Sequence, residues 1–281
     1  MPDDTRAAST THWRARLDLA FDRDGARTRL ARRSHEGPLV VQKPLYPEGD
    51  EVCQCIVVHP PGGIAGGDQL RLTVDVGRDA RAQLTTPGAA KWYRADGRPS
   101  AQHLEFSVAE GAVLEWLPQA SILFDGIDAR SDVRVRLACD SVYIAFDIVC
   151  LGRTASNERF DNGAWRQRVD VDRADALNWS ERAVLRGGDA LLRSSAGLNG
   201  APVFGTFAAM AAHIPDDLIA ACRKPAPVRG DGTVTRLPSA IIGRYRGDST
   251  EAAHAYFTAL WTIVRPALTG RIAVRPRIWS T

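Results

Sequence analysis

The chain has 281 residues, of which 44% are hydrophobic and 25% charged, a balance typical of a soluble protein with a buried core. The 36 basic residues nearly offset the 33 acidic ones, so the net charge of +3 does not indicate a nucleic-acid or membrane-surface binder. Five scattered cysteines without a Cys-x-x-Cys pair favour neither a disulfide framework nor a structural zinc site. The sequence has no apolar run of membrane-spanning length and no signal-peptide pattern, so we expect a cytoplasmic protein.

The amino-terminal part separates into a polar tail and a first pair of strands. Residues 1–11 contain no apolar cluster and are predicted to form a disordered tail, which leaves residues 12–281 as a single β-rich domain. Residues 17–21 and 28–32 alternate apolar and polar side chains. Arg-Asp-Gly at residues 23–25 predicts a hairpin turn between them.

A glycine-rich connection follows between two further strands. Residues 52–58 are β-branched and apolar, residues 70–76 alternate at period two, and the segment between them contains His-Pro-Pro-Gly-Gly-Ile-Ala-Gly-Gly-Asp at 59–68. Pro60 cannot donate to a ladder and should end the first strand, and Asp68 can hold the turn through its carboxylate. A phosphate-binding loop is not indicated, because a strand rather than a helix follows the glycines.

The middle of the chain continues as short strands separated by turn residues. Residues 142–150 are almost continuously apolar, which predicts an inner strand, whereas the prolines within residues 38–47 confine that segment to a sheet edge. Turn signals at about every ten residues indicate an all-β fold of many short antiparallel or mixed strands, in a sandwich or a stack of sheets. No fixed-period repeat of the solenoid kind is visible. The other predicted strands cover residues 80–84, 103–108, 112–117, 133–137, 165–171 and 176–185.

Helical patterns appear only near the carboxyl end. Residues 216–223 are predicted to form a short helix, and apolar residues at helical spacing predict a second helix near 249–265. Asp248, with a glutamate three residues later, has the spacing of an N-cap pair. Pro266 should kink or end this helix, and Gly270 should terminate what remains of it.

Four separated motifs together resemble one known family. The segment at residues 59–68 is followed by Leu-Thr-Thr-Pro-Gly-Ala-Ala-Lys-Trp-Tyr-Arg at 84–94, by Gly-Arg-Thr-Ala-Ser-Asn-Glu-Arg-Phe at 152–160, and by a close that begins Gly-Arg and ends Pro-Arg-Ile-Trp-Ser-Thr at 270–281. In this order the motifs resemble the UreD (also called UreH) family of urease accessory proteins. Asn157 stands where the family has glycine, and asparagine tolerates the left-handed conformation that such a turn requires.

The resemblance implies a function that the residue pattern alone does not reveal. Members of this family are helix-poor scaffolds with no catalytic activity of their own, and they work with UreF-like and UreG-like accessory proteins and with apo-urease. The UreG-like partner hydrolyses GTP, and the assembly delivers nickel to the urease active site. A passage for nickel through this subunit is part of that picture. The resemblance thus implies a transient Ni²⁺ ion, no tightly bound cofactor, and neither a nucleic-acid nor a membrane partner.

The motif positions carried over from this resemblance, together with Asp125 outside the motifs, are candidates for partner contact or for lining the passage. They are His59, Gly62, Gly63, Gly66, Gly67, Asp68, Thr85, Thr86, Lys91, Tyr93, Arg94, Asp125, Gly152, Arg153, Glu158, Arg277 and Trp279.

Two sets of side chains are candidates for contact with a metal ion. Cys53, Cys55 and His59 fall on one face of a predicted strand, and thiolate and imidazole suit an ion such as Ni²⁺. The alternative, which we favour, is that both cysteines fill the core and His59 caps the proline turn. Carboxylates could also line a polar passage that binds a cation weakly, although turns and ion pairs explain each of them as well. These carboxylates are Asp68, Asp125, Asp147, Glu158 and Glu181.

Two exposed stretches are candidates for partner contact. Lys91, Tyr93 and Arg94 follow a Pro-Gly turn, and tyrosine and arginine are enriched at interface hot spots; the alternative is a solvated loop. Trp279 lies close to the end of the chain, where a tryptophan is expected to be docked rather than free.

Function classes other than a scaffold remain open at this point. The sequence contains no Gly-x-Ser-x-Gly, no His-Glu-x-x-His and no phosphate-loop lysine, which weakens an enzymatic interpretation without excluding it. A metal-dependent hydrolase on a β scaffold would require a tight metal site with an open position. A β-sandwich ligand-binding module would require a large apolar pocket with a few polar groups.

Overall fold

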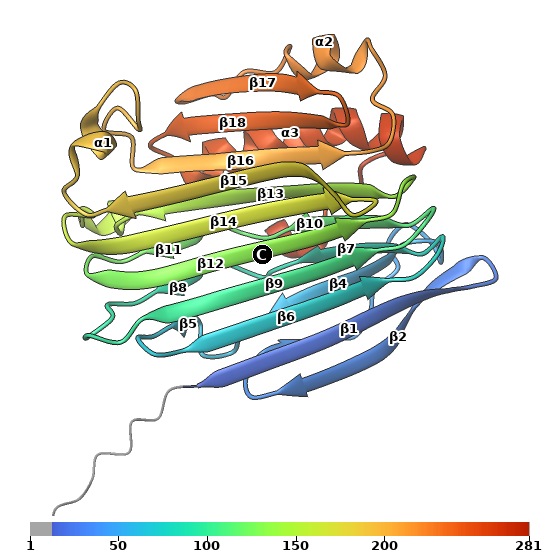
Figure 1. The fold of residues 1–281 in the computed structure, drawn as a ribbon, viewed down its shortest axis with the longest axis horizontal. Coiled ribbons are helices and arrows are strands. Elements are labelled where there is room, and N and C mark those ends of the chain that lie inside the picture. The colour runs from blue at the N-terminus through green and yellow to red at the C-terminus, as the bar shows by residue number, and fades with distance from the viewer. Residues whose placement is uncertain (1–12, 281) are drawn as a thin grey trace, which may run out of the picture.

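The computed structural model describes residues 13–280, and in it two large β-sheets lie one behind the other (Figure 1). The predicted tail at residues 1–11 therefore lies outside the described residues. We call the nearer sheet in Figure 1 the front sheet and the other the back sheet. The front sheet has seven strands, in the spatial order β15 (Ala176–Arg186), β14 (Gly163–Arg173), β12 (Ile127–Leu137), β9 (Ser100–Val108), β6 (Gln69–Val76), β1 (Arg14–Asp24) and β2 (Arg27–Glu36).

The back sheet has eleven strands and includes a small side branch. Its main path runs β17 (Asp231–Leu237), β18 (Ala240–Gly247), β16 (Val203–Met210), β13 (Val142–Leu151), β10 (Val113–Leu117), β7 (Arg81–Thr85), β4 (Cys53–Val58) and β3 (Val40–Val41). Its branch consists of β5 (Gly63–Ile64), β8 (Ala90–Trp92) and β11 (Ser121–Leu123).

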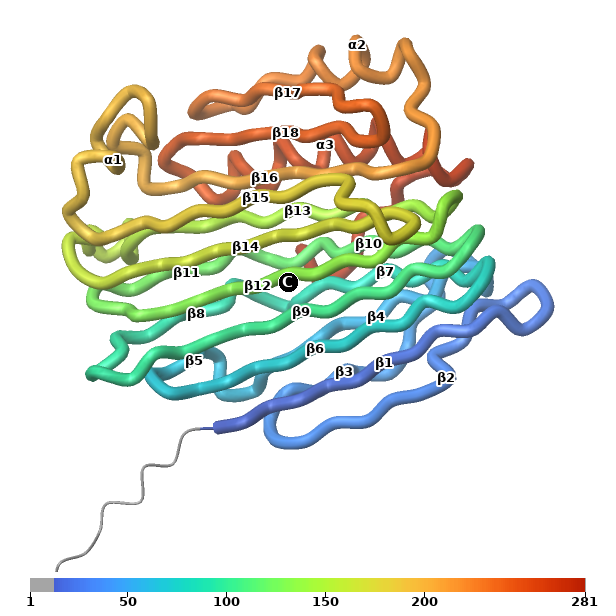
Figure 2. Tube along the Cα trace, viewed as in Figure 1, coloured from blue at the N-terminus to red at the C-terminus, as the bar shows by residue number. Residues whose placement is uncertain are grey.

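The centre of the fold is a coil in which the chain crosses repeatedly from one sheet to the other (Figure 2). Strands β4, β7, β10 and β13 pair in parallel in the back sheet, and β6, β9, β12 and β14 pair in parallel in the front sheet. The expected all-β stack is confirmed, and its winding is solenoid-like. The back-sheet strands begin at residues 53, 81, 113 and 142, so the coils differ in length and leave no fixed sequence period.

Local predictions made from turn and proline chemistry agree with this architecture. β1 and β2 form the expected hairpin around Gly25, and β4 ends at Val58, before the two prolines. β3 is a two-residue edge strand, and β13 is an inner strand between β10 and β16. The hairpin follows from a glycine with positive φ, the end of β4 and the edge position of β3 from the missing backbone donor of proline, and the inner position of β13 from apolar side chains on both faces.

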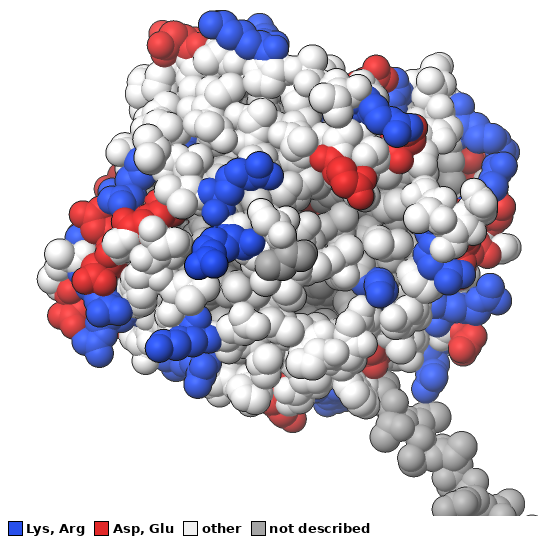
Figure 3. Space-filling model, turned by 180° about the vertical axis from the view of Figure 1, so that it is seen from behind, with Lys and Arg blue, Asp and Glu red and all other residues white. Residues whose placement is uncertain are grey.

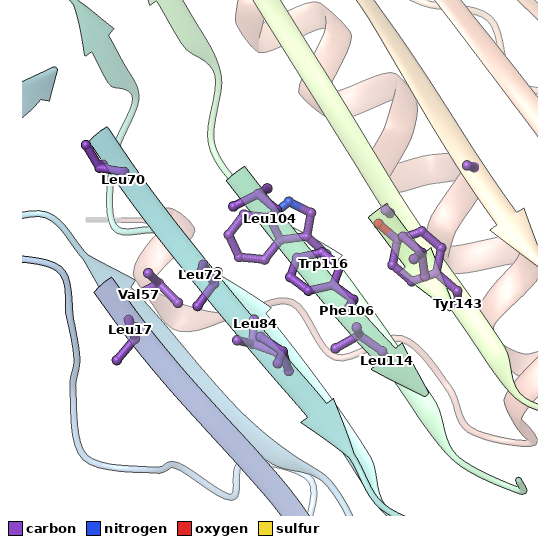
Figure 4. Packing of buried hydrophobic residues seen from close by; sticks show 14 of the residues in the cluster. Leu17, Val57, Leu70, Leu72, Leu84, Leu104, Phe106, Leu114, Trp116 and Tyr143 are labelled. Carbon is purple, nitrogen blue, oxygen red and sulfur yellow. The ribbon is translucent and has the colours of Figure 1, made fainter. Parts of the chain in front are cut away.

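Alternating side chains divide the interior into two layers of core. Leu72 and Leu104 of the front sheet meet Leu84 and Trp116 of the back sheet in the space between the sheets (Figure 4). The second layer lies between the back sheet and α3 (Thr250–Thr269), which packs behind β13, β16 and β18 (Figure 1). The apolar stripe of this helix is thus used for packing on the sheet.

The carboxyl-terminal helix differs from the sequence prediction at its N-cap and at Pro266. Ser249, not Asp248, caps α3, because its hydroxyl accepts the Ala252 N–H at 3.1 Å, while Asp248 forms an ion pair with Arg229. The helix continues through Pro266 as far as Thr269 and ends at Gly270, as expected, with a φ of 71°.

The remaining helices are short. They are α1 (Ala190–Arg193), α2 (Leu218–Cys222) within the predicted 216–223 segment, and the 3₁₀ turns η1 (Thr154–Ser156) and η2 (Arg277–Ser280). Among the described helices, none is both long and apolar enough to cross a membrane.

Candidate functional site

Three of the four sequence motifs converge at one end of the coil, where β5, β8 and β11 pair in parallel as the side branch of the back sheet (Figure 1). Gly63 lies opposite Lys91, and Ile122 lies opposite Lys91 on the other side of β8. The short strands thus place the loops at residues 59–68, 85–94 and 121–126 next to one another, although each comes from a different turn of the coil.

Close packing explains two of the motif glycines. A Cβ atom at Gly63 would lie 2.2 Å from the ring of Tyr93, and one at Gly152 would lie 2.4 Å from the carbonyl oxygen of Glu158. Both positions therefore admit only glycine without displacement of a neighbour. The other glycines of the motif shape the same turn, with Gly66 buried, Gly67 half-buried, and Gly62 exposed at the surface.

Two aspartates, one in the first motif and one between the second and third, hold turns. The carboxylate of Asp68 accepts the N–H groups of Ala65 at 2.8 Å and Trp13 at 3.1 Å. Asp125 accepts the backbone N–H groups of Asp161 at 2.9 Å and Asn162 at 2.7 Å. Partial burial opposes ionisation of Asp125, but these hydrogen bonds outweigh it and hold its pKa below the ordinary value. Both aspartates thus have the turn chemistry that their positions indicated.

The second signature forms a closed loop around an ion pair. Arg153 donates to both carboxylate oxygens of Glu158, at 2.8 and 3.1 Å, and the Arg153 backbone N–H also reaches this carboxylate. The hydrogen bond from the guanidinium lowers the pKa of Glu158. Asn157 adopts φ 57°, so asparagine does take the left-handed conformation here.

An arginine and two aromatic rings are stacked across this end of the molecule. The rings of Tyr93 and Phe124 meet edge to face with centroids 4.9 Å apart, and the Arg153 guanidinium lies 4.6 Å above the Phe124 ring. Tyr93 and Phe124 are half-buried, whereas Lys91, Arg94 and Arg153 are exposed. We call Tyr93, Phe124 and Arg153 the aromatic–arginine stack.

A cavity of about 450 Å³ runs between the two sheets and reaches these loops. His59, Gly63, Thr86, Lys91 and Gln119 line it at the motif end, and the walls beyond them are mostly apolar. Seen from behind, the surface has a hollow near its centre and is sparsely charged around it (Figure 3). The wall residues of the middle are Leu39, Val57, Leu70, Leu72, Leu104, Trp116, Val133, Tyr143, Ala145, Trp165, Val169 and Ala208.

Two acidic side chains lie at a different part of the same cavity. Asp147 of β13 accepts a hydrogen bond from Gln167 of β14, and Glu181 of β15 accepts one from Thr206 of β16 at 3.4 Å. All four side chains line the cavity. Burial, with a smaller contribution from Glu181, raises the pKa of Asp147 to about 6, although the Gln167 bond opposes this. Glu158 and Asp125 are not among the lining residues.

The proposed cysteine and histidine set does not gather as a metal site. Cys53 and Cys55 are fully buried in the core between the sheets, and the hydrogen bond that the Cys55 thiol donates to Cys53, together with burial, raises the pKa of Cys55. His59 lines the cavity, and within the described residues its Nε2 has no hydrogen-bond partner. Burial lowers the pKa of His59 despite the nearby Asp68 carboxylate. In residues 13–280 no three His, Cys, Asp or Glu side chains come together to hold a metal ion.

The carboxyl-terminal tryptophan packs against residues of its own chain. The Nε1–H of Trp279 donates to the Thr85 hydroxyl at 2.8 Å, and its ring lies edge to face 4.6 Å from that of His254. Burial lowers the pKa of His254 to about 4, so this ring is neutral near pH 7. Thr85 is the last residue of β7, and the adjacent Thr86 lines the cavity and accepts the Gln119 N–H at 2.9 Å. Trp279 therefore contacts the strand that leads directly to a lining residue of the cavity. Arg277 is exposed.

Sequence reasoning missed several residues of the cavity and its surroundings. Gln167 and Thr206 are polar side chains at inward positions of strands, and Phe124 is an aromatic residue beside a motif. The sequence did carry a signal for Gln167 and Thr206, because a polar residue on the core face of a strand requires a hydrogen-bond partner nearby. Their convergence depends on strand register, which the sequence does not specify.

These features define a class of protein: a helix-poor β-scaffold wound around an internal cavity, with three of its four sequence motifs gathered at one end. The family model described as UreD urease accessory protein matches residues 14–280. The chain therefore belongs to the UreD urease accessory protein family.

Curated relatives agree over almost the whole chain. "Urease accessory protein UreD" of Dechloromonas aromatica (strain RCB) is 51% identical over 273 residues, covering 96% of this chain and 95% of the relative. The protein of the same description from Azoarcus sp. (strain BH72) is 47% identical over 274 residues, covering 98% and 96%. "Urease accessory protein UreD 2" of Pseudomonas syringae pv. syringae (strain B728a) is 49% identical over 278 residues, covering 98% of each.

Proposed function

We propose that this chain is a cytoplasmic scaffold required for the insertion of nickel into apo-urease, and that it acts in a complex with UreF-like and UreG-like proteins. In this proposal it carries out no chemical step of its own. Support comes from the accessory role named in its relatives and from the cavity, which is lined by residues of the motifs at 59–68 and 84–94.

The cavity is the observation that carries the proposal, because its dimensions and chemistry suit transit of a small cation. Its volume of about 450 Å³ is about 2.5 times the volume of six water molecules, at about 30 Å³ each, that surround a hydrated Ni²⁺ ion. Polar groups lie at His59 near the loops and at Asp147 and Glu181, with apolar walls between them. Few and dispersed oxygen and nitrogen ligands bind Ni²⁺ weakly enough to release it. We therefore propose that nickel passes through this cavity as cargo and does not reside there.

The aromatic–arginine stack is proposed as a docking surface for a partner of the complex. Tyr93 and Arg153 are of the residue types that dominate interface hot spots, and Arg94 and Lys91 add exposed positive charge beside them. Because the stack is next to the loops that line the cavity, a partner bound there would be positioned at the end of the passage.

The test is co-expression of this chain with urease and with UreF-like and UreG-like proteins, followed by pull-down and a urease assay. We expect recovery of the partners and loss of urease activity when this chain is omitted. Asp147→Asn should lower activation while leaving the complex intact, whereas Tyr93→Ala should weaken recovery of a partner. Unchanged activation without this chain would refute the proposal. The exposed Arg130→Ala, on the outer face of the front sheet, is the matched control.

A ligand-binding module is the second candidate, because an apolar cavity of this size also lies within the range of about 300–1,000 Å³ that small-molecule sites occupy. It would be favoured if the purified chain retained an organic molecule detectable by mass spectrometry after denaturation. Substituting Trp116, which lines the middle of the cavity, by alanine should then release that molecule.

A further inference from the structure

A row of polar side chains leads from the cavity to the outer edge of the back sheet. Asp147 of β13 is registered with Thr206 of β16, Thr206 with Arg244 of β18, and Arg244 with Thr233 of the edge strand β17. All four lie on the face that carries Ala208 and Ile242 of the inter-sheet core. Since strands are about 4.8 Å apart, the row extends about 14 Å from the cavity to the exposed Thr233.

Glu181 reaches this row from the front sheet. Its Oε1 accepts hydrogen bonds from Arg244 and Thr206, and Arg244 also donates to Thr206 at 2.6 Å. Glu181 Oε2 is buried, and within the described residues it has no hydrogen-bond partner. Asp147, Glu181 and Thr206 line the cavity, whereas Arg244 lies beyond them in the row, with 45% of its side chain exposed.

We propose that Arg244 is the gate at the carboxylate end of the cavity, and that a divalent cation leaves or enters there by displacing its guanidinium from Glu181. This inference rests on the proposed passage of nickel and adds a second mouth to it. The first mouth lies at the Thr86 to Lys91 loop, and the second lies along the row that ends at Thr233.

The electrostatics of the row make Arg244 a competitor of the cation. The Arg244 guanidinium neutralises Glu181 and repels any other cation that approaches Asp147. Such a cation finds only Asp147 free, because Glu181 is already paired with Arg244. A Ni²⁺ ion carries twice the charge of the guanidinium and can use the unpartnered Oε2 as well. Arg244 has solvent on its other side, so its long side chain can swing away from Glu181 without being buried elsewhere.

Titration of the purified full-length chain with NiCl₂, followed by calorimetry, tests the gate. Arg244→Gln removes the competing charge and keeps a polar side chain, so we expect Ni²⁺ to bind about tenfold more tightly than to the wild type. The gain should disappear when Glu181→Gln is added. The matched control is Arg182→Gln, which removes the same charge one residue from Glu181 on the opposite face of β15.

The outcomes separate the gate from the passage itself. The gate is overturned if Arg244→Gln binds Ni²⁺ no better than Arg182→Gln, or if the tighter binding persists without Glu181. Urease activation at limiting nickel gives the second measurement, in which Asp147→Asn and Glu181→Gln should lower activity. If both carboxylate variants lower activation while Arg244→Gln behaves like Arg182→Gln in both assays, the passage is supported and the gate is refuted. If neither carboxylate variant changes activation, the passage and the gate fall together.

Discussion

Replacing Arg265 by methionine should destabilise the protein more than any exposed ion-pair substitution. Its side chain is 2% exposed, and the two carboxylates that it meets, Glu48 and Glu115, are each 3% exposed. The guanidinium donates to Glu115 at 2.9 and 3.1 Å and to Glu48 at 2.7 and 2.9 Å. Burial disfavours the charged guanidinium, but the two carboxylates outweigh it and raise the pKa of Arg265.

The expected magnitude follows from the charges that Arg265→Met would leave behind. Removing one partner of a buried ionic cluster costs about 3–5 kcal/mol, because the remaining charges are uncompensated in a medium of low dielectric constant. The charge left at Glu48 would still have Arg271, whose Nε lies 3.9 Å away. We therefore expect a loss near the lower end, about 3 kcal/mol in the free energy of unfolding.

Denaturant unfolding of the full chain, followed by circular dichroism, measures this loss. The control is Arg166→Met, which breaks an ion pair with Asp128 whose side chains are 46% and 45% exposed and which should cost less than about 1 kcal/mol. Adding Glu115→Gln to Arg265→Met should recover about 1–2 kcal/mol, because one unpaired charge is removed. A loss for Arg265→Met no larger than that of Arg166→Met would refute the reasoning.

Three further predictions concern the loops, the carboxyl end and the cavity. Gly63→Ala should cost about 2 kcal/mol or more in unfolding free energy through its clash with a tyrosine ring, whereas Gly88→Ala, where a Cβ has open space in the described chain, should be neutral within about 0.5 kcal/mol. Trp279→Phe keeps an aromatic ring but loses the hydrogen bond to Thr85, so thermal unfolding should report a loss of about 1 kcal/mol. The pKa of Asp147 in the folded state is raised to about 6, so the ionised carboxylate destabilises the folded protein above that pH. Asp147→Asn should therefore be more stable than the wild type at pH 7. This advantage should shrink as the pH falls from 6 to 4, because the wild-type carboxyl becomes protonated. An advantage that is independent of pH would contradict this assignment.

Local chemistry made several parts of the fold predictable. The hairpin at Gly25, the end of β4 before Pro60 and the left-handed Asn157 all depend on neighbouring backbone groups, which the sequence displays directly. The same local reasoning went wrong at Asp248. Two adjacent residues, Asp248 and Ser249, can both cap a helix, and a distant arginine, Arg229, engages the aspartate.

The winding and the cavity were not predictable, because they depend on pairings between distant segments. Parallel strands require crossovers, and the alternating patterns of β6 and β9 are equally compatible with antiparallel neighbours. Asp147, Thr206 and Arg244 form a row only because three strands share one register, and a shift by one residue would turn each side chain to the other face. The sequence shows that each is polar but not that they are neighbours.

The two buried acidic centres of this chain are satisfied to very different degrees, and this contrast bears on their roles. Glu115 accepts hydrogen bonds from Gln83 at 3.0 Å, Trp261 at 2.7 Å and Arg265 at 2.9 Å, so its charge is fully compensated. Asp147 accepts from one side-chain amide, and Glu181 keeps one buried oxygen without a partner in the described structure. A fold that can enclose one carboxylate so completely gains no stability from leaving two others incompletely bonded. The remaining acceptor capacity at Asp147 and Glu181 is what a cation on the proposed passage would use.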